Sequence, residues 1–361
     1  MQGGKDNKKV IVHISTDEKF LVGYVNFMKK YMQGYKHAFI IESKRSIEFD
    51  DNQDVYFVAS IRNIYGNRIL YGLLRNADKI IISGLFSINL YYSMMPKKIF
   101  NKTYIHLWGG DFYCLRERKQ GFSEWLDRTT RLICIKRCAG IIMLIEKEYE
   151  VFHEICGIDK LNFIAEMPMD IEDITVCLDE NLQLPISVDK ERTNVLVGNS
   201  ATEENLHLEV FRLLHDYAKE EYELYVPLSY GNDTYKEIVL KKGRELFREH
   251  FHPLLEYMPE ATYINLLNTM DIGIFNNNRQ QATRNIEIML QLGKTLYMRD
   301  DTTMYAFYTK RGITLHNVSD IQSEQGLKTL NEEEREKNIC VVEDIQRVSH
   351  RIDQWETVLS Y

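Results

Sequence analysis

Short apolar runs alternate with segments of helical periodicity along most of the chain, and this alternation constrains the fold more than any other feature. A typical helical segment is 20–31, where apolar residues recur every three or four positions. Strand-length runs separated by such helices predict parallel sheets covered by helices, which is an α/β fold. The expected strands are 10–14, 38–41, 55–59, 79–83, 103–107, 140–144, 162–164, 195–197, 223–226, 271–275, 295–298 and 313–315.

The chain is long enough to form two domains. Its 361 residues exceed the size at which a single hydrophobic core usually stops growing. The polar segment 179–193 contains Pro185 and lacks a strong periodicity, so it predicts the connection between the two domains. We therefore expect domains at 1–180 and 194–342, a linker at 181–193 and a last helix within 343–361.

The composition argues against several classes of protein. A net charge of −8 argues against a nucleic-acid binder, whose affinity depends on neutralising phosphates. The six cysteines include no CxxC pair and no secretory segment opens the chain, so we expect reduced thiols, a cytoplasmic location and no structural metal. Apolar runs such as 140–145 are far shorter than the roughly 20 residues that a membrane-spanning helix needs.

The segment 195–205 (VLVGNSATEEN) predicts a strand, a tight turn and a helix that begins after Ser200. Gly198 permits a positive φ, and the free N–H groups at a helix start attract anions such as phosphate. Many α/β units turn at similar sequences without binding anything. The pattern alone leaves both interpretations open.

The segment 105–113 (IHLWGGDFY) places a histidine, a tryptophan, two glycines and an acid at the end of one expected strand. Loops at this edge of an α/β sheet often carry function. His106 fits a core histidine or a catalytic one. Asp111 fits a helix cap or a general base.

Loops in the second half carry further polar residues at strand ends. Residues 275–281 (FNNNRQQ) supply one cation and five amides, and residues 226–233 (VPLSYGND) form a turn-rich loop. Either Arg279 or Arg284 would neutralise a diphosphate. Glu287 would accept hydrogen bonds from ribose hydroxyls, although an acid near a helix start also balances the helix dipole.

A basic stretch lies at 97–137, with ten Lys and Arg residues against four acids. Phe122 and Trp125 lie among these cations. Basic residues around aromatics on a helix favour contact with anionic lipid headgroups or a lipid-linked diphosphate. An ordinary solvated helix face has the same composition, so both interpretations stay open.

Four blocks of the sequence match the pattern of one family: residues 12–18, 106–113 (HLWGGDFY), 196–207 (LVGNSATEENLH) and 279–281 (RQQ). Residues 226–230 (VPLSY) are also similar to that family's VPMGY loop. In these blocks the chain resembles the TDP-N-acetylfucosamine:lipid II N-acetylfucosaminyltransferases, the 4-alpha-L-fucosyltransferase-like family of enterobacterial common antigen synthesis. The resemblance extends over nearly the whole chain.

The resemblance implies an α/β GT-B architecture, in which two Rossmann-like domains face each other across a cleft. The domain at 1–180 would bind the acceptor and the domain at 194–342 would bind the nucleotide sugar. The helix in 343–361 would pack back on the first domain. No cofactor is expected, and in particular no metal, because backbone amides, a helix N-terminus and basic side chains would stabilise the diphosphate leaving group.

The resemblance and the loop chemistry together yield a set of candidate site residues. The donor-binding candidates are Gly198, Asn199, Ser200, Tyr230, Arg279, Gln280, Gln281, Arg284 and Glu287, and the catalytic candidates are Asp111, His106, Asp17 and Glu18. The chain departs from the family after Gln281, where residues 282–285 (ATRN) replace a glycine-rich GIGT. This departure leaves open which sugar and which nucleobase the donor carries.

The expected function is transfer of a deoxyamino sugar, such as 4-acetamido-4,6-dideoxygalactose, from a nucleoside diphosphate to a polyprenyl-diphosphate-linked glycan. TDP is the first expectation for the nucleotide, and the enzyme would be peripheral on the inner face of the cytoplasmic membrane. If the reaction inverts, Asp111 first, and Asp17 or Glu18 second, would act as the base. If it retains, the departing phosphate would take the proton. A nucleotide-sugar epimerase and a non-catalytic nucleotide-sugar-binding protein remain as alternatives.

Overall fold

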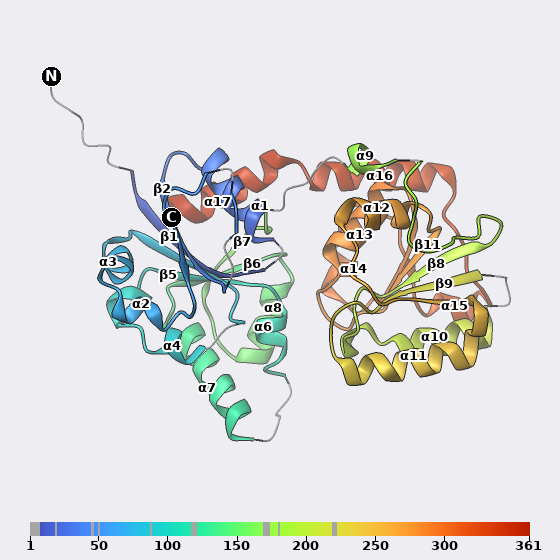
Figure 1. Cartoon of the computed structure of the whole chain (residues 1–361), viewed down its shortest axis with the longest axis horizontal. Coiled ribbons are helices and arrows are strands. Elements are labelled where there is room, and N and C mark those ends of the chain that lie inside the picture. Colours follow the sequence, from blue (N-terminus) through green and yellow to red (C-terminus); the bar gives the residue numbers. More distant parts are fainter. Residues whose placement is uncertain are drawn as a thin grey trace. The chain divides into compact units, whose positions relative to one another are not determined.

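A computed structural model of the chain describes residues 8–18, 20–44, 47–49, 51–86, 89–116, 121–168, 174–179, 181–218 and 222–361. The chain divides into two compact units (Figure 1). Unit 1 comprises Met1–Asp170 and Val348–Tyr361, and unit 2 comprises Ile171–Arg347. The division thus falls at 170 and 347, whereas the sequence places the ends of its domains at 180 and 342.

Unit 1 contains a parallel seven-stranded sheet in the order β3-β2-β1-β4-β5-β6-β7. Its strands are β1 (Val10–Thr16), β2 (Lys36–Glu42), β3 (Val55–Val58), β4 (Lys79–Ser83), β5 (Thr103–Leu107), β6 (Gly140–Met143) and β7 (Leu161–Ile164). All five residues of β4 are buried, because helices cover both faces of the sheet. The order reverses between β1 and β4, and ligands bind at such a reversal in open α/β sheets.

Two hydrophobic cores cover the two faces of this sheet. The helices of the unit are α1 (Leu21–Tyr31), α2 (Asn63–Gly66), α3 (Arg68–Asn76), α4 (Asn89–Ser93), α5 (Lys97–Phe100), α6 (Gly110–Tyr113), α7 (Phe122–Arg137), α8 (Glu148–Cys156) and α17 (Val348–Ser360). One core joins the sheet to α2 through α8, and the other joins it to α1 and α17. Trp355 of α17 is fully buried there, and its Nε1 donates to the Glu166 carbonyl. The last helix is therefore part of the first unit.

Unit 2 contains a parallel six-stranded sheet in the order β10-β9-β8-β11-β12-β13. Its strands are β8 (Thr193–Val197), β9 (Tyr222–Pro227), β10 (Phe251–Leu254), β11 (Ile272–Phe275), β12 (Thr295–Met298) and β13 (His316–Asn317). This order has the Rossmann pattern, with its reversal between β8 and β11.

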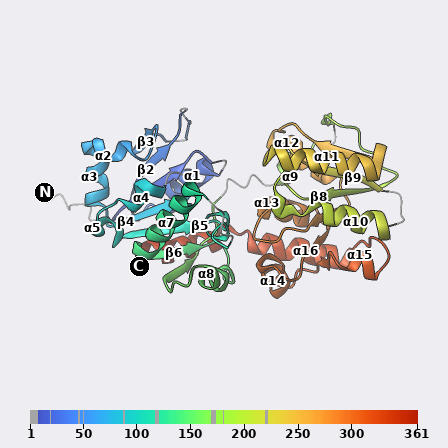
Figure 2. The same cartoon turned by 90° about the horizontal axis from the view of Figure 1, so that it is seen from below.

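Helices also cover both faces of the second sheet (Figure 1). They are α9 (Ile174–Cys177), α10 (His207–Tyr217), α11 (Asp233–Phe247), α12 (Glu260–Asn268), α13 (Thr283–Gln291), α14 (Thr303–Lys310), α15 (Asp320–Ser323) and α16 (Glu332–Ile345), with 3₁₀ turns η1 (Glu203–Asn205) and η2 (Arg248–His250). Figure 2 shows α10 and α11 in front of β8 and β9. Their apolar residues share one core with alternate residues of these strands.

The structure differs from the expectations at two strands and in the last helix. The expected strand 313–315 is a loop, because the Asn338 side chain bonds both the N–H and the carbonyl of Thr314 in place of a neighbouring strand. The edge strand β10 has no counterpart among the expected strands. It contains Pro253, a residue that sheets tolerate at their edges. The expected last helix is two helices, because Ile345 ends α16 and Val348 begins α17.

Candidate functional site

The candidate donor site lies in unit 2, where the strand order reverses. Strands β8 and β11 are hydrogen-bonded neighbours, so the loops that follow them leave the same edge of the sheet side by side. The first loop carries Gly198, Asn199 and Ser200. The second carries Arg279, Gln280 and Gln281.

Gly198 begins the first loop with a positive φ of 69°. A Cβ at this position would lie 2.7 Å from both Asn205 Oδ1 and His207 Nε2. Only glycine therefore lets the chain turn this closely over the residues that follow it. The close approach expected of the GNS turn is present.

The expected helix start after Ser200 is wrong. Ala201 forms an isolated β-bridge with Gly231, its N–H donates to the Tyr230 carbonyl at 2.8 Å, and its carbonyl accepts from the Asn232 N–H. The 3₁₀ turn η1 follows, and α10 begins only at His207. Pairing with the loop after β9 thus takes the Ala201 N–H, which a helix starting here would have left free.

Asn205 is the centre of the hydrogen-bond network in this loop. Its fully buried side chain accepts from the Asn199 N–H at 2.9 Å and donates to Thr202 Oγ1 at 2.9 Å and Ser200 Oγ at 3.2 Å. Asn277, from the loop after β11, donates to Asn205 Oδ1 at 3.2 Å. One side chain therefore joins the two loops.

Gln281 and Tyr230 complete the network. Gln281 Nε2 lies 3.2 Å from both Ser200 Oγ and Thr202 Oγ1. The half-exposed Tyr230 accepts a hydrogen bond from Asn199 Nδ2 at 3.0 Å. The structure thus brings the GNS turn, Tyr230 and Gln281 into one polar cluster.

Arg279 lies beside this cluster and is held by an acid. Its Nε donates to Glu204 Oε1 at 3.2 Å, and its Nη1 donates to the Gln280 carbonyl at 3.1 Å. Burial alone would raise the pKa of Glu204, but the Arg279 guanidinium and local hydrogen bonds outweigh it and lower that pKa. Glu204 is therefore ionised at neutral pH. The Gln280 side chain itself bonds Thr283 at the start of α13.

The remaining donor candidates, Arg284 and Glu287, lie on α13. Arg284 Nη2 donates to Glu260 Oε1 at 2.9 Å, while its Nη1 is buried and has no hydrogen-bond partner among the described residues. Glu287 is 4% exposed, and its Oε2 accepts from Gln346 Nε2 at 2.9 Å. The hydrogen bonds described for Arg284 and Glu287 are therefore to residues outside the Asn205 network.

In unit 1, Asp111 is a buried carboxylate that accepts backbone hydrogen bonds. The Trp108 N–H donates to its two oxygens at 3.0 and 3.2 Å, and the Leu85 N–H donates to Oδ2 at 3.4 Å. Complete burial raises its pKa to about 6, against the opposing charge of Arg131 and these hydrogen bonds. Asp111 lies in the first turn of α6, whose N-cap is Gly109, so it is not the helix cap that the sequence suggested; its bonds tie the loops after β4 and β5 together.

His106 has the surroundings of a core histidine. It is fully buried, its Nε2 donates to the Ala165 carbonyl at 3.0 Å, and its ring lies edge-on to Trp355. Burial lowers its pKa to about 4, although the Ala165 carbonyl opposes this shift. The imidazole is therefore neutral at physiological pH.

Asp17 and Glu18 follow β1 at the strand reversal of unit 1. Asp17 is half-buried and accepts from Ser43 Oγ at 3.0 Å, while Glu18 is exposed. Both carboxylates are thus nearer to solvent than Asp111.

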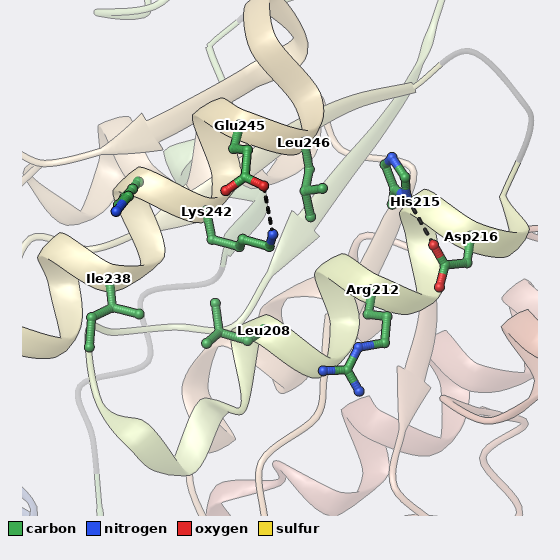
Figure 3. A pocket seen from close by; sticks show the side chains of 9 residues that line it. Leu208, Arg212, His215, Asp216, Ile238, Lys242, Glu245 and Leu246 are labelled. Atoms are coloured by element: carbon green, nitrogen blue, oxygen red, sulfur yellow. Dashed lines mark hydrogen bonds and ion pairs between the residues drawn. The ribbon is translucent and has the colours of Figure 1, made fainter.

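A surface groove of about 590 Å³ lies between α10 and α11 (Figure 3). Charged residues of the lining pair with one another. Lys242 pairs with Glu245 and His215 pairs with Asp216, both at 2.9 Å. None of the donor candidates lines it. This groove is separate from the candidate site.

Part of the expected basic surface cannot be followed, because Arg118 and Lys119 lie outside the described residues. Within the described ranges, no group of three or more His, Cys, Asp or Glu side chains is placed to hold a metal ion. No helix in the same part of the chain is both long and apolar enough to cross a membrane.

Several residues that the sequence analysis did not select take part in the candidate site. Asn205, Asn277 and Glu204 carry the contacts between its loops. Asn205 and Glu204 lie in the block 196–207, and its match to the family was the available signal for them. No local signal marked the contact of Asn277 with Asn205, because the two residues are 72 positions apart.

Comparisons with known proteins bear on the family and the fold. A model of the family described as 4-alpha-L-fucosyltransferase, glycosyl transferase group 56, matches residues 33–334.

Solved structures show the same fold at low sequence identity. A glycosyltransferase from Rickettsia africae has a TM-score of 0.67 at 12% identity, with 98% of each chain covered. A structure described as trehalose-6-phosphate from E. coli bound with UDP-2-fluoro glucose has a TM-score of 0.64 at 12% identity, covering 97% of this chain and 99% of that one. A putative UDP-N-acetylglucosamine 2-epimerase from Listeria monocytogenes has a TM-score of 0.52 at 14% identity, covering 92% and 90%. The expected α/β GT-B fold is confirmed.

Proposed function

Because the chain belongs to the 4-alpha-L-fucosyltransferase family, glycosyl transferase group 56, and is a glycosyltransferase, we propose that it transfers a deoxyamino sugar to a lipid-linked glycan. The donor would be a TDP-sugar related to 4-acetamido-4,6-dideoxygalactose. The acceptor would be a polyprenyl-diphosphate-linked oligosaccharide of bacterial surface polysaccharide synthesis, used by a peripheral enzyme at the inner face of the cytoplasmic membrane. Family membership decides against the epimerase and the non-catalytic alternatives.

The observation that carries the donor half of this proposal is the joining of the loops after β8 and β11 through Asn205. It supports a site for the nucleoside diphosphate at the strand reversal of unit 2. Arg279 and Arg284 would neutralise the diphosphate, the amides of Gln280 and Gln281 would donate to its oxygens, and Glu287 would accept from the ribose. These groups would stabilise the leaving group without a metal.

The chemical step is a substitution at the anomeric carbon of the donor sugar. An acceptor hydroxyl oxygen forms the new bond to this carbon, the bond from the carbon to the phosphate oxygen breaks, and the nucleoside diphosphate leaves. In an inverting reaction the hydroxyl proton goes to a carboxylate. Asp17 is half-buried and Glu18 is exposed, and this access to solvent supports either of them as the base ahead of Asp111, whose oxygens are buried and accept backbone hydrogen bonds.

A transfer assay in the presence of EDTA tests the proposal. The enzyme is incubated with TDP-, UDP- or GDP-activated deoxyamino sugars and a prenyl-diphosphate-linked disaccharide, and the products are analysed by mass spectrometry. We expect one glycosylated lipid and one equivalent of free nucleoside diphosphate. Release of an isomerised nucleotide sugar without an acceptor product would contradict the proposal.

A further inference from the structure

A cavity of about 570 Å³ lies in unit 1 beside the first turns of α7. Its volume is within the range of small-molecule sites. It is lined by Phe86, which follows β4, by Gly110 of α6, which follows β5, and by Trp125 of α7. Since β4 and β5 are parallel neighbours, the cavity lies at the carboxyl edge of the sheet, where α/β folds bind ligands.

One side of the cavity is aromatic and uncovered. Trp125 is 56% exposed and Phe86 is 44% exposed, whereas comparable side chains in this unit, such as Phe112, are buried. The Trp125 ring stacks on Phe122, which is itself 76% exposed, at a centroid distance of 5.8 Å. Figure 1 shows that the beginning of α7 extends beyond the helices around it. Exposed aromatic surface facing a cavity is typical of a binding site for an apolar group.

The other side of the cavity is cationic. Arg131 is buried, and its Nε has no hydrogen-bond partner in the described part of the chain. Its other nitrogens bond the Leu85 and Asp111 carbonyls and Asp127. Arg128 also lines the cavity, with Nη1 donating to the Leu115 carbonyl. Arg131 is already paired with Asp127, so the guanidinium of Arg128 is the one left to bind a phosphate or diphosphate.

The acids of the lining offset one of these two cations. Asp127 is already engaged, with Oδ2 2.9 Å from Arg131 Nη2 and Oδ1 2.9 Å from Asn89 Nδ2. Glu124 is exposed in the first turn of α7. The cavity therefore combines an apolar wall with one guanidinium, that of Arg128, which forms no ion pair among the described residues.

We propose that this cavity binds the prenyl diphosphate part of the acceptor. The diphosphate lies against Arg128, and the first isoprene units lie against Phe86 and Trp125. This inference rests on the proposed function, because it assigns a place to the lipid end of the proposed acceptor.

The test is calorimetric titration of the whole chain with farnesyl diphosphate, inorganic pyrophosphate or farnesol, with saturating TDP present to fill the donor site. We expect farnesyl diphosphate to bind at least about tenfold more tightly than either half alone, because only it engages both walls. Trp125→Ser and Arg128→Gln should each weaken this binding about tenfold. Lys136→Gln, on the same helix but outside the cavity, and Tyr257→Ser, a more exposed aromatic in unit 2, should leave it unchanged.

Melting temperatures of the variants show that each remains folded. Equal binding of pyrophosphate and farnesyl diphosphate would overturn the assignment, because the site would then recognise free phosphate groups only. Unchanged farnesyl diphosphate binding in both Trp125→Ser and Arg128→Gln would also overturn it. Failure of TDP to bind contradicts the proposed function instead, so the two failures are distinguishable.

Discussion

The carboxylate of Glu204 holds the guanidinium of Arg279 at the edge of the candidate donor site, with Oε1 3.2 Å from Nε. Because Nη1 donates to the Gln280 carbonyl, the guanidinium is fixed at two points. Among the described residues, Nη2 makes no hydrogen bond, so this nitrogen remains available for a ligand. Glu204 therefore orients the cation that would meet the donor diphosphate.

Replacing Glu204 tests this orienting role. We expect Glu204→Gln to raise the dissociation constant of the nucleoside diphosphate about tenfold, because the guanidinium loses its charged anchor. Simple electrostatics predicts the opposite sign, since removing a nearby negative charge favours anion binding. Glu203→Gln is the matched control, because it makes the same charge change at the neighbouring exposed position. Tighter binding in Glu204→Gln, measured by calorimetry, would refute the orienting role.

Replacing Gly198 tests the close turn after β8. Gly198→Ala should abolish nucleotide binding, because its Cβ would come within 2.7 Å of Asn205 Oδ1 and His207 Nε2. Gly157→Ala is a control for backbone strain: Gly157 has a similar φ of 61°, but a Cβ there meets nothing within 4 Å. That control should lose about 1 kcal/mol of stability and keep nucleotide binding. Normal binding by Gly198→Ala would show that the turn does not need glycine.

The choice of base predicts different outcomes for two carboxylates. We expect Asp17→Asn to depress transfer by about 10² to 10⁴ at unchanged donor affinity, if the reaction inverts and Asp17 is the base. Asp111→Asn should retain most of its transfer activity at temperatures where it is folded, because its carboxylate accepts backbone hydrogen bonds. Single-turnover rates with both variants decide between them. A large loss in Asp111→Asn with normal transfer in Asp17→Asn would reverse the assignment.

Buried histidines predict a loss of stability in acid. Burial lowers the pKa of His106 to about 4, below that of an unfolded histidine, so the unfolded chain binds more protons as the pH falls below about 6.5. Between pH 7 and pH 5 this group alone should remove about 2 kcal/mol from the free energy of unfolding. The variant His106→Gln keeps an N–H for the Ala165 carbonyl. Its free energy of unfolding should therefore fall by about 2 kcal/mol less than that of the wild type between pH 7 and pH 5. Urea unfolding at both pH values measures the difference, and an equal slope in the two proteins would contradict it.

The titration of Asp111 should raise the stability of the fold on acidification, opposite to the effect of His106. Burial raises its pKa to about 6, so the folded chain binds more protons than the unfolded one between about pH 4 and pH 6. Protonation of Asp111 on acidification therefore stabilises the fold and offsets part of the histidine effect. Asp111→Asn should lose more stability than the wild type between pH 7 and pH 5. A smaller loss, measured by the same urea unfolding, would contradict the raised pKa.

The fold could be predicted from the sequence because its strands carry a strong local signal. The runs 79–83, 103–107 and 295–298 match β4, β5 and β12 at both ends, since parallel strands buried on both faces are apolar throughout. The glycine turn at Gly198 was visible for the same reason, as a break directly after such a run. Features that depend on neighbouring strands, such as the short β13, were not visible.

The candidate site could be predicted only in part, because its contacts join distant segments. Arg279 and Glu204 are 75 positions apart, and Asn277 and Asn205 are 72 apart, so no local pattern connects them. The helix start after Ser200 was mispredicted for the same reason. The competing partner of Ala201 is Tyr230, in the loop after another strand. The burial of Asp111 is likewise a tertiary property, since Leu85 and Arg131 come from separate elements.

The most direct test of the central claim is calorimetric titration of the whole chain with TDP, UDP and GDP, in EDTA and again in magnesium chloride. The account predicts that one of these diphosphates binds at a single site with equal affinity in both buffers. At 100 times its dissociation constant this ligand should stabilise the fold by about 2.7 kcal/mol. Gly198→Ala should abolish this binding and Glu203→Gln should not. Absence of binding by all three diphosphates in both buffers, with the protein folded, would contradict a nucleoside-diphosphate site in unit 2.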